Sequence, residues 1–335
     1  MSIEEFMDLK FPVSNMEKNI PVVRRKTEIR QSPSYINAII EIQKCSAQEA
    51  NELGFIARLL VQATMPHSKP KSNEWSRRNG NFTLHMMAPS SVGLPYGRYA
   101  RLLLVWVTTK AIRNKARMDK GFITEKEARR LDLGPSQRGL MSDLGIRSSG
   151  GDNGSTDPFR DQIRRLFKTT ISVIFTEIQE DAGYIFEMDA GARVAETSCI
   201  WWSTKQTEQD LLQGSYIELS PKFFQLITDR PVPIDLRVFR LIKKSKMALD
   251  IYCWATYRVS YLKRSTVIPW LSLMDQMGAN YASVEGFKKR FENGLKIVQQ
   301  IWPALDASPT KKGLLLNPSH PHVPRKKDRS NEVCN

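Results

Sequence analysis

The chain has 335 residues, of which 50 are Lys or Arg and 35 are Asp or Glu, so its formal net charge is +15. This length favours about two domains, and an apolar fraction of 41% is enough to build cores. A basic excess of this size favours a polyanionic partner, because each cation placed against a phosphate releases a counterion. The cations run through amphipathic segments as well as the C-terminal end. Nucleic acid is therefore favoured over a membrane surface, plain solubility or a basic tail on a neutral domain.

Cysteine spacing and hydropathy argue against several protein classes. The four cysteines are Cys45, Cys199, Cys253 and Cys334. They include no Cys-x-x-Cys pair, so they support neither a zinc site nor a disulfide framework, and they fit a reducing cytoplasm. The longest unbroken apolar run, residues 102–107, is far below the ~18 residues that span a bilayer, and the polar start of the chain is no signal peptide. We expect a cytoplasmic protein with no metal, no cofactor and no membrane partner.

The first elements along the chain are an arm, a helix, a strand and a second helix. Residues 1–33 are polar and mixed in charge, which predicts a mobile N-terminal arm. Ser46 and Glu49 form a capping-box pattern that predicts a helix from there to about Gln62. Alternation of apolar residues predicts a strand over 81–88, and a strongly apolar segment predicts a buried helix over about 100–116.

One short phrase occurs twice: residues 140–146 read LMSDLGI and residues 273–279 read LMDQMGA. Each predicts a short helix that stops at a glycine and is followed by a long basic amphipathic helix. The first long helix begins near residues 157–158, after a glycine-rich loop, and the second is capped by Ser283 and runs to about Ile301. Alternating residues after each long helix predict a β-hairpin, over 174–188 and over 304–317.

This repeated layout is typical of a helix-turn-helix followed by a wing. We therefore predict an α+β fold, mainly α, that consists of two tandem winged-helix domains. The predicted division is a mobile arm (1–33), a first winged-helix domain (34–203), a polar linker (204–214), a second winged-helix domain (215–317) and a basic disordered tail (318–335). A helix, a glycine turn and a helix also occur as ordinary core packing, but the duplication, the hairpins and the basic outer faces favour DNA binding.

Candidate DNA contacts follow from the polar faces of the two long helices. In the first helix three cations recur at every fourth position, and they are Arg160, Arg164 and Lys168. In the second helix, its turn and its hairpin the candidates are Tyr281, Ser283, Lys288, Lys289 and Lys312. Such side chains either anchor phosphates or read base edges, and both roles stay open for them. The alternative for the first set is a solvated face on which Asp157 and Asp161 pair with the arginines.

Catalytic motifs are weak in this chain. It contains no Gly-x-x-x-x-Gly-Lys-[Ser/Thr] motif, so a Walker-type helicase is not indicated. The His-Pro-His run at 320–322 imitates a metal-binding pair of nicking enzymes, but no tyrosine occurs among the 13 residues that follow it (335 minus 322). We predict a protein that is not an enzyme.

Many short motifs of this chain resemble the plasmid-encoded RepA family of replication initiators, in order and over about residues 40–325. In the first half they are 63–67 (ATMPH), 79–80 (NG), Leu84, 93–97 (GLPYG), 101–104 (RLLL), 133–136 (LGPS), 150–151 (GG) and 160–167 (RDQIRRLF). In the second half they are 233–237 (PIDLR), 248–252 (ALDIY), Trp254, 268–270 (IPW), Pro318, Pro321, His322 and Val323.

The resemblance implies a bacterial plasmid protein that binds repeated sites in double-stranded DNA at its own origin. It would help to melt an adjacent AT-rich stretch and recruit host replication proteins such as a helicase or an initiator. We expect the second domain to supply most of the sequence reading. The first would contact the DNA backbone and mediate homodimerisation. Dimers would sequester the monomers and in this way control plasmid copy number. Two alternatives stay open: a winged-helix transcriptional repressor that binds a single inverted repeat as a dimer, with half-sites about one helical turn apart, and a nicking or priming enzyme.

Overall fold

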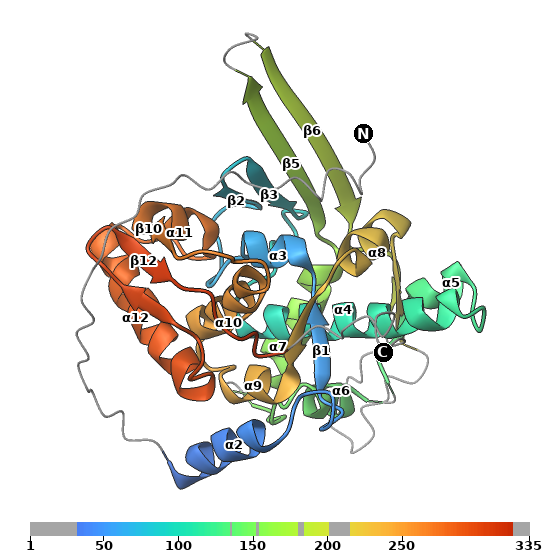
Figure 1. Ribbon diagram of the computed structural model, residues 1–335. Helices are drawn as coiled ribbons and strands as arrows, with labels where there is room; N and C mark the ends of the chain where they lie inside the picture. Colours follow the sequence, from blue (N-terminus) through green and yellow to red (C-terminus); the bar gives the residue numbers. More distant parts are fainter. Residues whose placement is uncertain (1–31, 135, 152–153, 180–183, 201–214, 324–335) are drawn as a thin grey trace, which may run out of the picture.

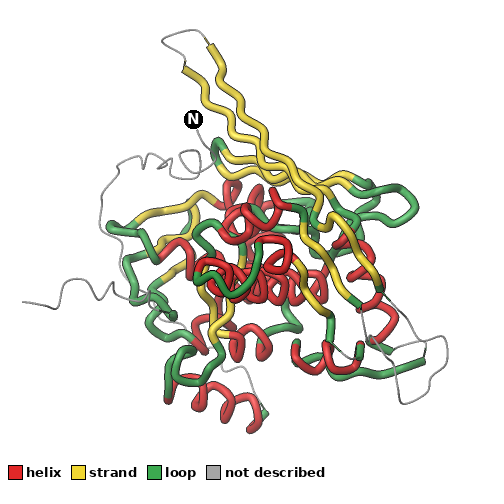
Figure 2. The backbone as a smooth tube through the Cα atoms, turned by 90° about the vertical axis from the view of Figure 1, so that its right-hand side faces the viewer, coloured by secondary structure: helices red, strands yellow, loops and turns green. Residues whose placement is uncertain are grey.

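The computed structural model describes residues 32–323, except for 135, 152–153, 180–183 and 201–214. The predicted arm and linker therefore lie almost wholly outside the described residues. Helices predominate over strands, which agrees with the predicted α+β class (Figures 1 and 2). Within the described ranges, no helix is both long and apolar enough to cross a membrane.

The N-terminal part differs from the predicted helix over 46–62. The observed elements are α2 (Pro33–Lys44), β1 (Leu53–Ile56) and α3 (Arg58–Gln62). The capping box does form, because Ser46 N donates to Glu49 at 2.8 Å and Glu49 N donates to the Ser46 hydroxyl at 3.2 Å. The helix does not continue, because Asn51 adopts a positive φ of 54° and the next residues pair with β9 (Val232–Asp235), a strand distant in sequence.

The middle of the chain is arranged around α4 (Gly97–Asp119), whose first half is almost completely buried. This helix packs against α5 (Glu125–Arg129), α7 (Thr156–Phe167), α8 (Pro221–Thr228) and β1. The other elements here are β2 (Glu74–Asn79), β3 (Phe82–Met87), β4 (Arg130–Asp132), α6 (Gln137–Asp143), β5 (Thr170–Gln179), β6 (Tyr184–Arg193) and β7 (Ala195–Cys199).

The predicted first hairpin is confirmed, and it is longer than expected. Strands β5 and β6 pair over their whole length, whereas β3 pairs with only residues 170–175 of β5. The hairpin therefore completes a sheet of order β2-β3-β5-β6 and its outer part projects from the body of the protein (Figures 1 and 2).

The second half follows the predicted pattern more closely. Its elements are β8 (Tyr216–Leu219), α8, β9, α9 (Leu236–Leu241), α10 (Lys246–Val259), β10 (Thr266–Pro269), α11 (Trp270–Gln276), α12 (Val284–Ile301), β11 (Ala307–Pro309) and β12 (Gly313–Leu316). As predicted, Ser283 caps α12, and the inward stripe from Phe287 to Val298 is buried. Strand β10, which precedes α11, joins the hairpin in a sheet of order β10-β12-β11.

The two halves share sheets and a core. Strand β8 lies between β4 and β7, and β1 pairs with β9, so strands from both sides of residues 204–214 are hydrogen-bonded together. One continuous cluster of buried apolar residues runs through both halves. The predicted division into two domains stays a prediction. In the structure the two halves share sheets and one core, and we call this shared part of the protein the frame.

The predicted disordered tail is wrong for residues 318–323. The carbonyl of His320 accepts a hydrogen bond from the Trp302 indole at 3.1 Å. The His322 ring contacts those of Tyr252 and Trp302, with centroids 5.6 and 5.7 Å apart, and Val323 is buried. Aromatic packing and a hydrogen bond therefore hold this segment on the core, and the rest of the predicted tail lies outside the described residues.

Candidate nucleic-acid interface

The two repeated phrases form the predicted helices α6 and α11, but the glycine that follows has a different role in each. Gly145 takes a positive φ of 65° after α6, and Ile146 N donates to the Met141 carbonyl at 2.7 Å, which is a left-handed helix cap. Gly278, after α11, has no positive φ. A Cβ there would overlap the backbone carbonyl of Met65, so the position requires glycine because another segment approaches closely.

The cations predicted on α7 divide into one that is paired and two that are exposed. Arg160 lies 3.5 Å from Asp157 and donates to the side chain of Gln137 at 3.2 Å, so it ties α7 to α6. The pair with Asp157 is part of what the solvated-face alternative expected. Arg164 and Lys168 expose their side chains. Contact of these three residues with DNA stays a prediction.

Two of the candidates that precede or begin α12 have structural roles. The hydroxyl of Ser283 accepts a hydrogen bond from Gly286 N at 3.1 Å, which is a helix N-cap. The ring of Tyr281 packs edge-on against Phe287, with centroids 5.5 Å apart, and burial raises its pKa. Both residues therefore hold the turn in shape, whatever else they contact.

Of the two candidate lysines on α12, Lys288 makes contacts within the protein and Lys289 is exposed. Lys288 lies over the ring of Trp270, at 5.4 Å from its centroid, and its Nζ is 3.4 Å from the carbonyl of Thr310. It thus connects α12 with α11 and with the β11–β12 turn. Lys289 and its neighbour Arg290 are exposed, and Arg290 is a cation that the sequence reasoning did not single out.

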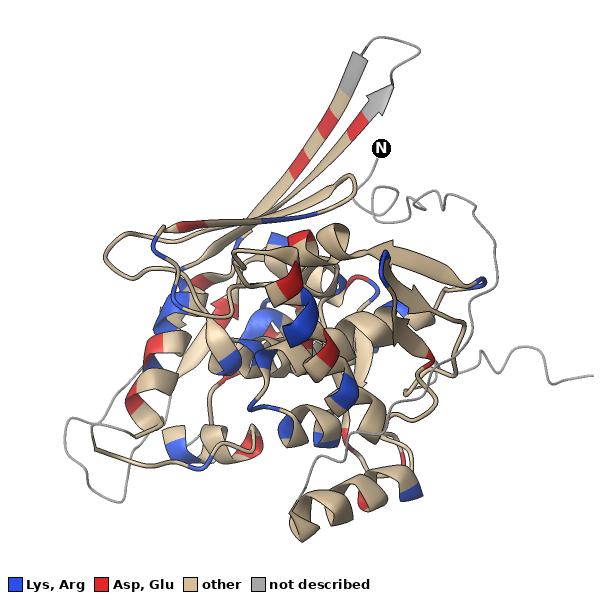
Figure 3. Ribbon diagram, turned by 90° about the vertical axis from the view of Figure 1, so that its left-hand side faces the viewer, with Lys and Arg blue, Asp and Glu red and all other residues tan. Residues whose placement is uncertain are grey.

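The two hairpins carry opposite charge. The turn between β11 and β12 exposes Lys311 and Lys312. Residues 170–192, by contrast, contain no Lys or Arg and five acidic residues. Three of these have described side chains, and they are Glu177, Glu187 and Asp189. Figure 3 shows acidic but no basic positions along this projecting hairpin. Electrostatic repulsion makes it unsuited to contact phosphates, unlike the basic second hairpin.

A buried ion pair lies at the centre of the frame. Arg101 of α4 donates two hydrogen bonds to Asp250 of α10, at 2.6 and 2.7 Å, and the ring Nε2 of His67 is 2.7 Å from the same carboxylate. The remaining Arg101 donors reach the carbonyls of Met65, Pro66 and Gly97. Three elements distant in sequence are thereby joined.

Protonation in this cluster follows from burial and the Arg101 charge. Burial alone would raise the pKa of Asp250, but the Arg101 charge and the hydrogen bonds from Arg101 and His67 hold that pKa well below its ordinary value. Burial and then the Arg101 charge lower the pKa of His67, although Asp250 acts in the opposite direction. The arrangement at neutral pH is therefore an ionised pair with a neutral imidazole.

The same cluster positions the second repeated turn. The loop that carries His67 receives the turn after α11: Thr64 N donates to the Gln276 carbonyl at 2.8 Å and His67 N donates to the Gly278 carbonyl at 2.5 Å. On the other side, Arg77 of β2 donates to the Met277 carbonyl at 2.7 Å and to Asn280. Contacts from the first half of the chain thus fix the position of the turn that leads into α12.

Sequence reasoning missed the buried cluster of Arg101, Asp250 and His67, although all three residues lie in motifs that carry the family resemblance. Arg101 opens the run RLLL and Asp250 lies inside ALDIY. A charged residue next to or within a run of apolar residues in a helix is a recognisable signal, because such a charge needs a partner when it is buried. Nothing in the sequence pairs these two residues with each other. Arg77 gave no signal of this kind.

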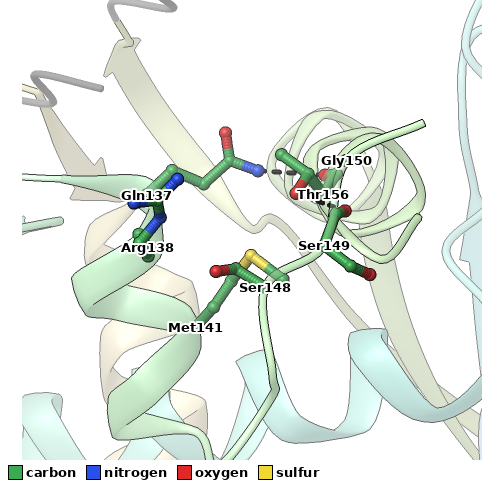
Figure 4. Close-up of a pocket in the computed structure, with 7 residues that line it drawn as sticks. All are labelled: Gln137, Arg138, Met141, Ser148, Ser149, Gly150 and Thr156. Atoms are coloured by element: carbon green, nitrogen blue, oxygen red, sulfur yellow. Dashed lines mark hydrogen bonds between the residues drawn. The ribbon is translucent and has the colours of Figure 1, made fainter. Parts of the chain in front are cut away.

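A small cleft beside α6 does not have the size of a ligand site. It encloses about 60 Å³ between α6 and the loop before α7, where Gln137 donates to the Thr156 carbonyl at 2.9 Å (Figure 4). Its lining residues are Gln137, Arg138, Met141, Ser148, Ser149, Gly150 and Thr156. Sites for drug-sized ligands enclose roughly 300–1,000 Å³. No group of three or more His, Cys, Asp or Glu side chains in the described part of the chain is arranged to hold a metal ion.

Comparisons with known proteins give a family and similar solved structures, two of which are described here. Residues 94–271 match the model of a family described as plasmid-encoded RepA protein. No curated protein matches the chain. A crystal structure of RctB domains 2–3 is similar with 13% identity and a TM-score of 0.41, covering 77% of this chain and 94% of that one. A selenomethionine derivative of RctB domains 2 and 3 gives 10% identity and a TM-score of 0.43, with 78% and 96% covered.

Proposed function

Since this chain belongs to the plasmid-encoded RepA protein family, we propose that it is a replication initiator that acts in the bacterial cytoplasm. It binds repeated sites at its own origin, promotes local melting and recruits host replication proteins. The proposal needs no catalytic residue, metal or cofactor of the chain's own.

The observation that carries the proposal is a pair of helix–glycine–helix units fixed in one frame. Each unit ends in a longer helix with exposed cations, which are Arg164 and Lys168 on and after α7 and Lys289 and Arg290 on α12. Two such helices held by a common core could contact one DNA duplex at two places without an ordering cost on binding. The net charge of +15 supplies the attraction to phosphates.

We interpret the second unit as a winged helix. Its element order is α10, β10, α11, α12, β11, β12, and its sheet order is β10-β12-β11, which is typical of that module. In this interpretation α12 enters the major groove and the Lys311–Lys312 turn contacts the backbone. The first unit would grip DNA through α7 alone, because its hairpin is acidic and β4 pairs with β8 instead of with the hairpin.

The runner-up is a transcriptional repressor with the same units. It would bind one inverted repeat as a dimer, whereas an initiator binds several direct repeats. DNase footprinting of the purified protein on the DNA that surrounds its own gene distinguishes the two. Several protected direct repeats support the initiator, and a single protected palindrome supports the repressor.

A pair of variants tests whether α12 faces DNA. Lys289→Ala with Arg290→Ala should weaken binding and reduce the slope of log K against log salt by about 1 for each lost phosphate contact. The matched control is Lys120→Ala with Lys126→Ala. These two lysines are exposed at the end of α4 and on α5, on the opposite side of the molecule from α12 (Figure 1). Equal slopes for both pairs would mean that α12 does not approach the backbone.

A further inference from the structure

Five cations from two parts of the chain gather at the turn between α9 and α10. They are Arg98 in the first turn of α4, Arg240 of α9, Lys243 and Lys244 in the turn, and Lys246 at the start of α10. Arg98 and Lys244 are exposed, and the other three are half-buried. We call these five residues the junction cluster.

Direct contacts join the junction cluster to the first repeated turn. Lys243 donates a hydrogen bond to the carbonyl of Gly145, the glycine that ends the α6 phrase. The side chain of Arg240 packs over the same glycine, where an added Cβ would lie 2.7 Å from its Cδ. The cluster therefore adjoins the turn that leads from α6 towards α7.

The junction cluster is linked to the second repeated turn only indirectly, through the buried Arg101 and the segment that carries Met65. Lys246 lies within electrostatic range of Arg98 and of the buried Arg101. Arg101 in turn contacts the Met65 carbonyl, against which Gly278 packs. The cluster thus contacts the first turn directly and is connected with the second turn through Arg101 and Met65.

The positive charge of the junction cluster is incompletely neutralised. Arg240 pairs with Glu52 at 2.5 Å. None of the other four takes part in the ion pairs found within the described ranges, and Asp250, which acts electrostatically on Lys246, is already bonded to Arg101 and His67. Burial and then neighbouring cations lower the pKa of both Lys243 and Lys246. Holding like charges together in this way costs stability, and an anion bound there would remove the cost.

We propose that the junction cluster is a phosphate-binding site for the DNA backbone, located beside the first repeated turn and connected with the second. This inference rests on the proposed function and extends it. A solvated basic face would have its cations spread out and paired with acids. Here Arg98 of α4 lies near four cations of the segment from α9 to the start of α10, beside the first turn. The exposed Arg98 and Lys244 suit an extended polyanion that crosses the surface, and the contacts are with phosphates, so they carry no sequence preference.

The test compares two triple variants with the same change of charge. Arg98→Gln, Lys244→Gln and Lys246→Gln remove three cations of the cluster and leave the Lys243 contact with Gly145 intact. The control is Arg117→Gln, Lys120→Gln and Lys126→Gln, at the far end of α4 and on α5, where all three residues are exposed. Fluorescence anisotropy with a footprinted duplex and with an unrelated duplex, each over a series of salt concentrations, measures affinity.

The cluster variant should lose affinity by the same factor for both duplexes, and its salt slope should decrease by about 2–3 relative to the parent. The control should keep a slope close to that of the parent. If both variants keep the parent's slope, the cluster does not contact DNA and the inference is wrong, although the proposed function stands. If the parent itself binds no duplex from around its own gene, the proposed function fails first.

Free phosphates are the other source of the same chemistry. Thermal unfolding with added pyrophosphate or ATP separates the two sources. An increase in Tm for the parent and not for the cluster variant, together with unchanged DNA slopes, would assign the site to a free nucleotide and overturn the DNA assignment. A loss of DNA affinity in the cluster variant, without any effect of ATP on the Tm of the parent, supports the DNA assignment.

Discussion

The buried pair between Arg101 and Asp250 allows a sharp test of how the halves are held together. The perturbation is Asp250→Asn, which keeps the shape of the side chain but removes its charge. Asp250 is almost completely buried and accepts two hydrogen bonds from Arg101 and one from His67. The substitution leaves the Arg101 guanidinium buried without a counter-charge.

The expected magnitude follows from what remains around Arg101. Removal of one partner from a buried ion pair costs roughly 3–5 kcal/mol, because the other charge stays in a poorly solvated place. Arg101 keeps three carbonyl acceptors, those of Met65, Pro66 and Gly97. We therefore expect a loss near the lower end, about 3 kcal/mol, which is a large fraction of the ~5–15 kcal/mol typical of a folded domain.

Urea unfolding followed by tryptophan fluorescence measures this loss, since Trp254, on the same helix as Asp250, and Trp270 of α11 are both buried. The control is Asp119→Asn, which breaks an exposed pair with Lys115 at 3.1 Å and should cost no more than ~1 kcal/mol. If Asp250→Asn costs no more than this control, the pair does not hold the frame and the reasoning is refuted. Affinity for DNA should decrease with stability, because α12 begins at a turn that this cluster positions.

Substitutions at three further positions test other parts of the argument. Leu273→Asp should abolish cooperative folding of the second half, because it buries an unpaired charge at a fully buried position of α11; circular dichroism of a stable, fully active variant would show that α11 is placed wrongly. Ser283→Ala should lower stability by about 1 kcal/mol through loss of the N-cap. Ser283→Asp should keep stability but weaken DNA binding through like-charge repulsion, and unchanged affinity in anisotropy measurements would place this helix start away from DNA. The lowered pKa of His67 keeps its folded imidazole neutral, whereas the unfolded one binds a proton below about pH 6.5. Stability should therefore decrease as pH falls from 7 to 5, by up to ~1.4 kcal/mol per pH unit for this group, and less so in His67→Gln; identical slopes in urea unfolding would contradict the assigned protonation state.

Sequence periodicity predicted the helices and strands that are specified by residues near to them in the sequence. Helix α12 begins after Ser283 and ends at Ile301 as the sequence indicates, because a cap and an apolar stripe specify both. The first hairpin was predicted from alternation for the same reason. Strand β1 was missed, because its partner β9 is distant in sequence and nothing local favours an extended conformation after the Ser46 capping box. The segment 318–323 was missed because its burial depends on Tyr252 and Trp302.

The candidate site was predictable in outline and less so in detail. The duplicated phrase located α6 and α11, but it did not reveal that Gly145 is required for its φ and Gly278 for its contact with Met65. Glycine is thus required at the two equivalent positions for different structural reasons. Of the eight proposed contact residues, Ser283 and Tyr281 take part in holding the turn. Such roles depend on which neighbours the fold brings close, and a sequence pattern does not contain that information.

The residues that carry the family resemblance are mostly those that fix the frame. Arg101, Asp250 and Tyr252 are buried, and the segment 63–67 receives the turn after α11. Several exposed cations that we propose to contact DNA, such as Lys289 and Lys244, lie outside these motifs, although Arg164 lies within one of them. A buried charge pair tolerates little change, because either partner alone is costly, whereas an exposed lysine can be replaced at little cost in stability. Most of the shared motifs in this chain therefore reflect how its two units are positioned, and the cations that we propose for DNA contact on α12 and in the junction cluster are surface residues outside them.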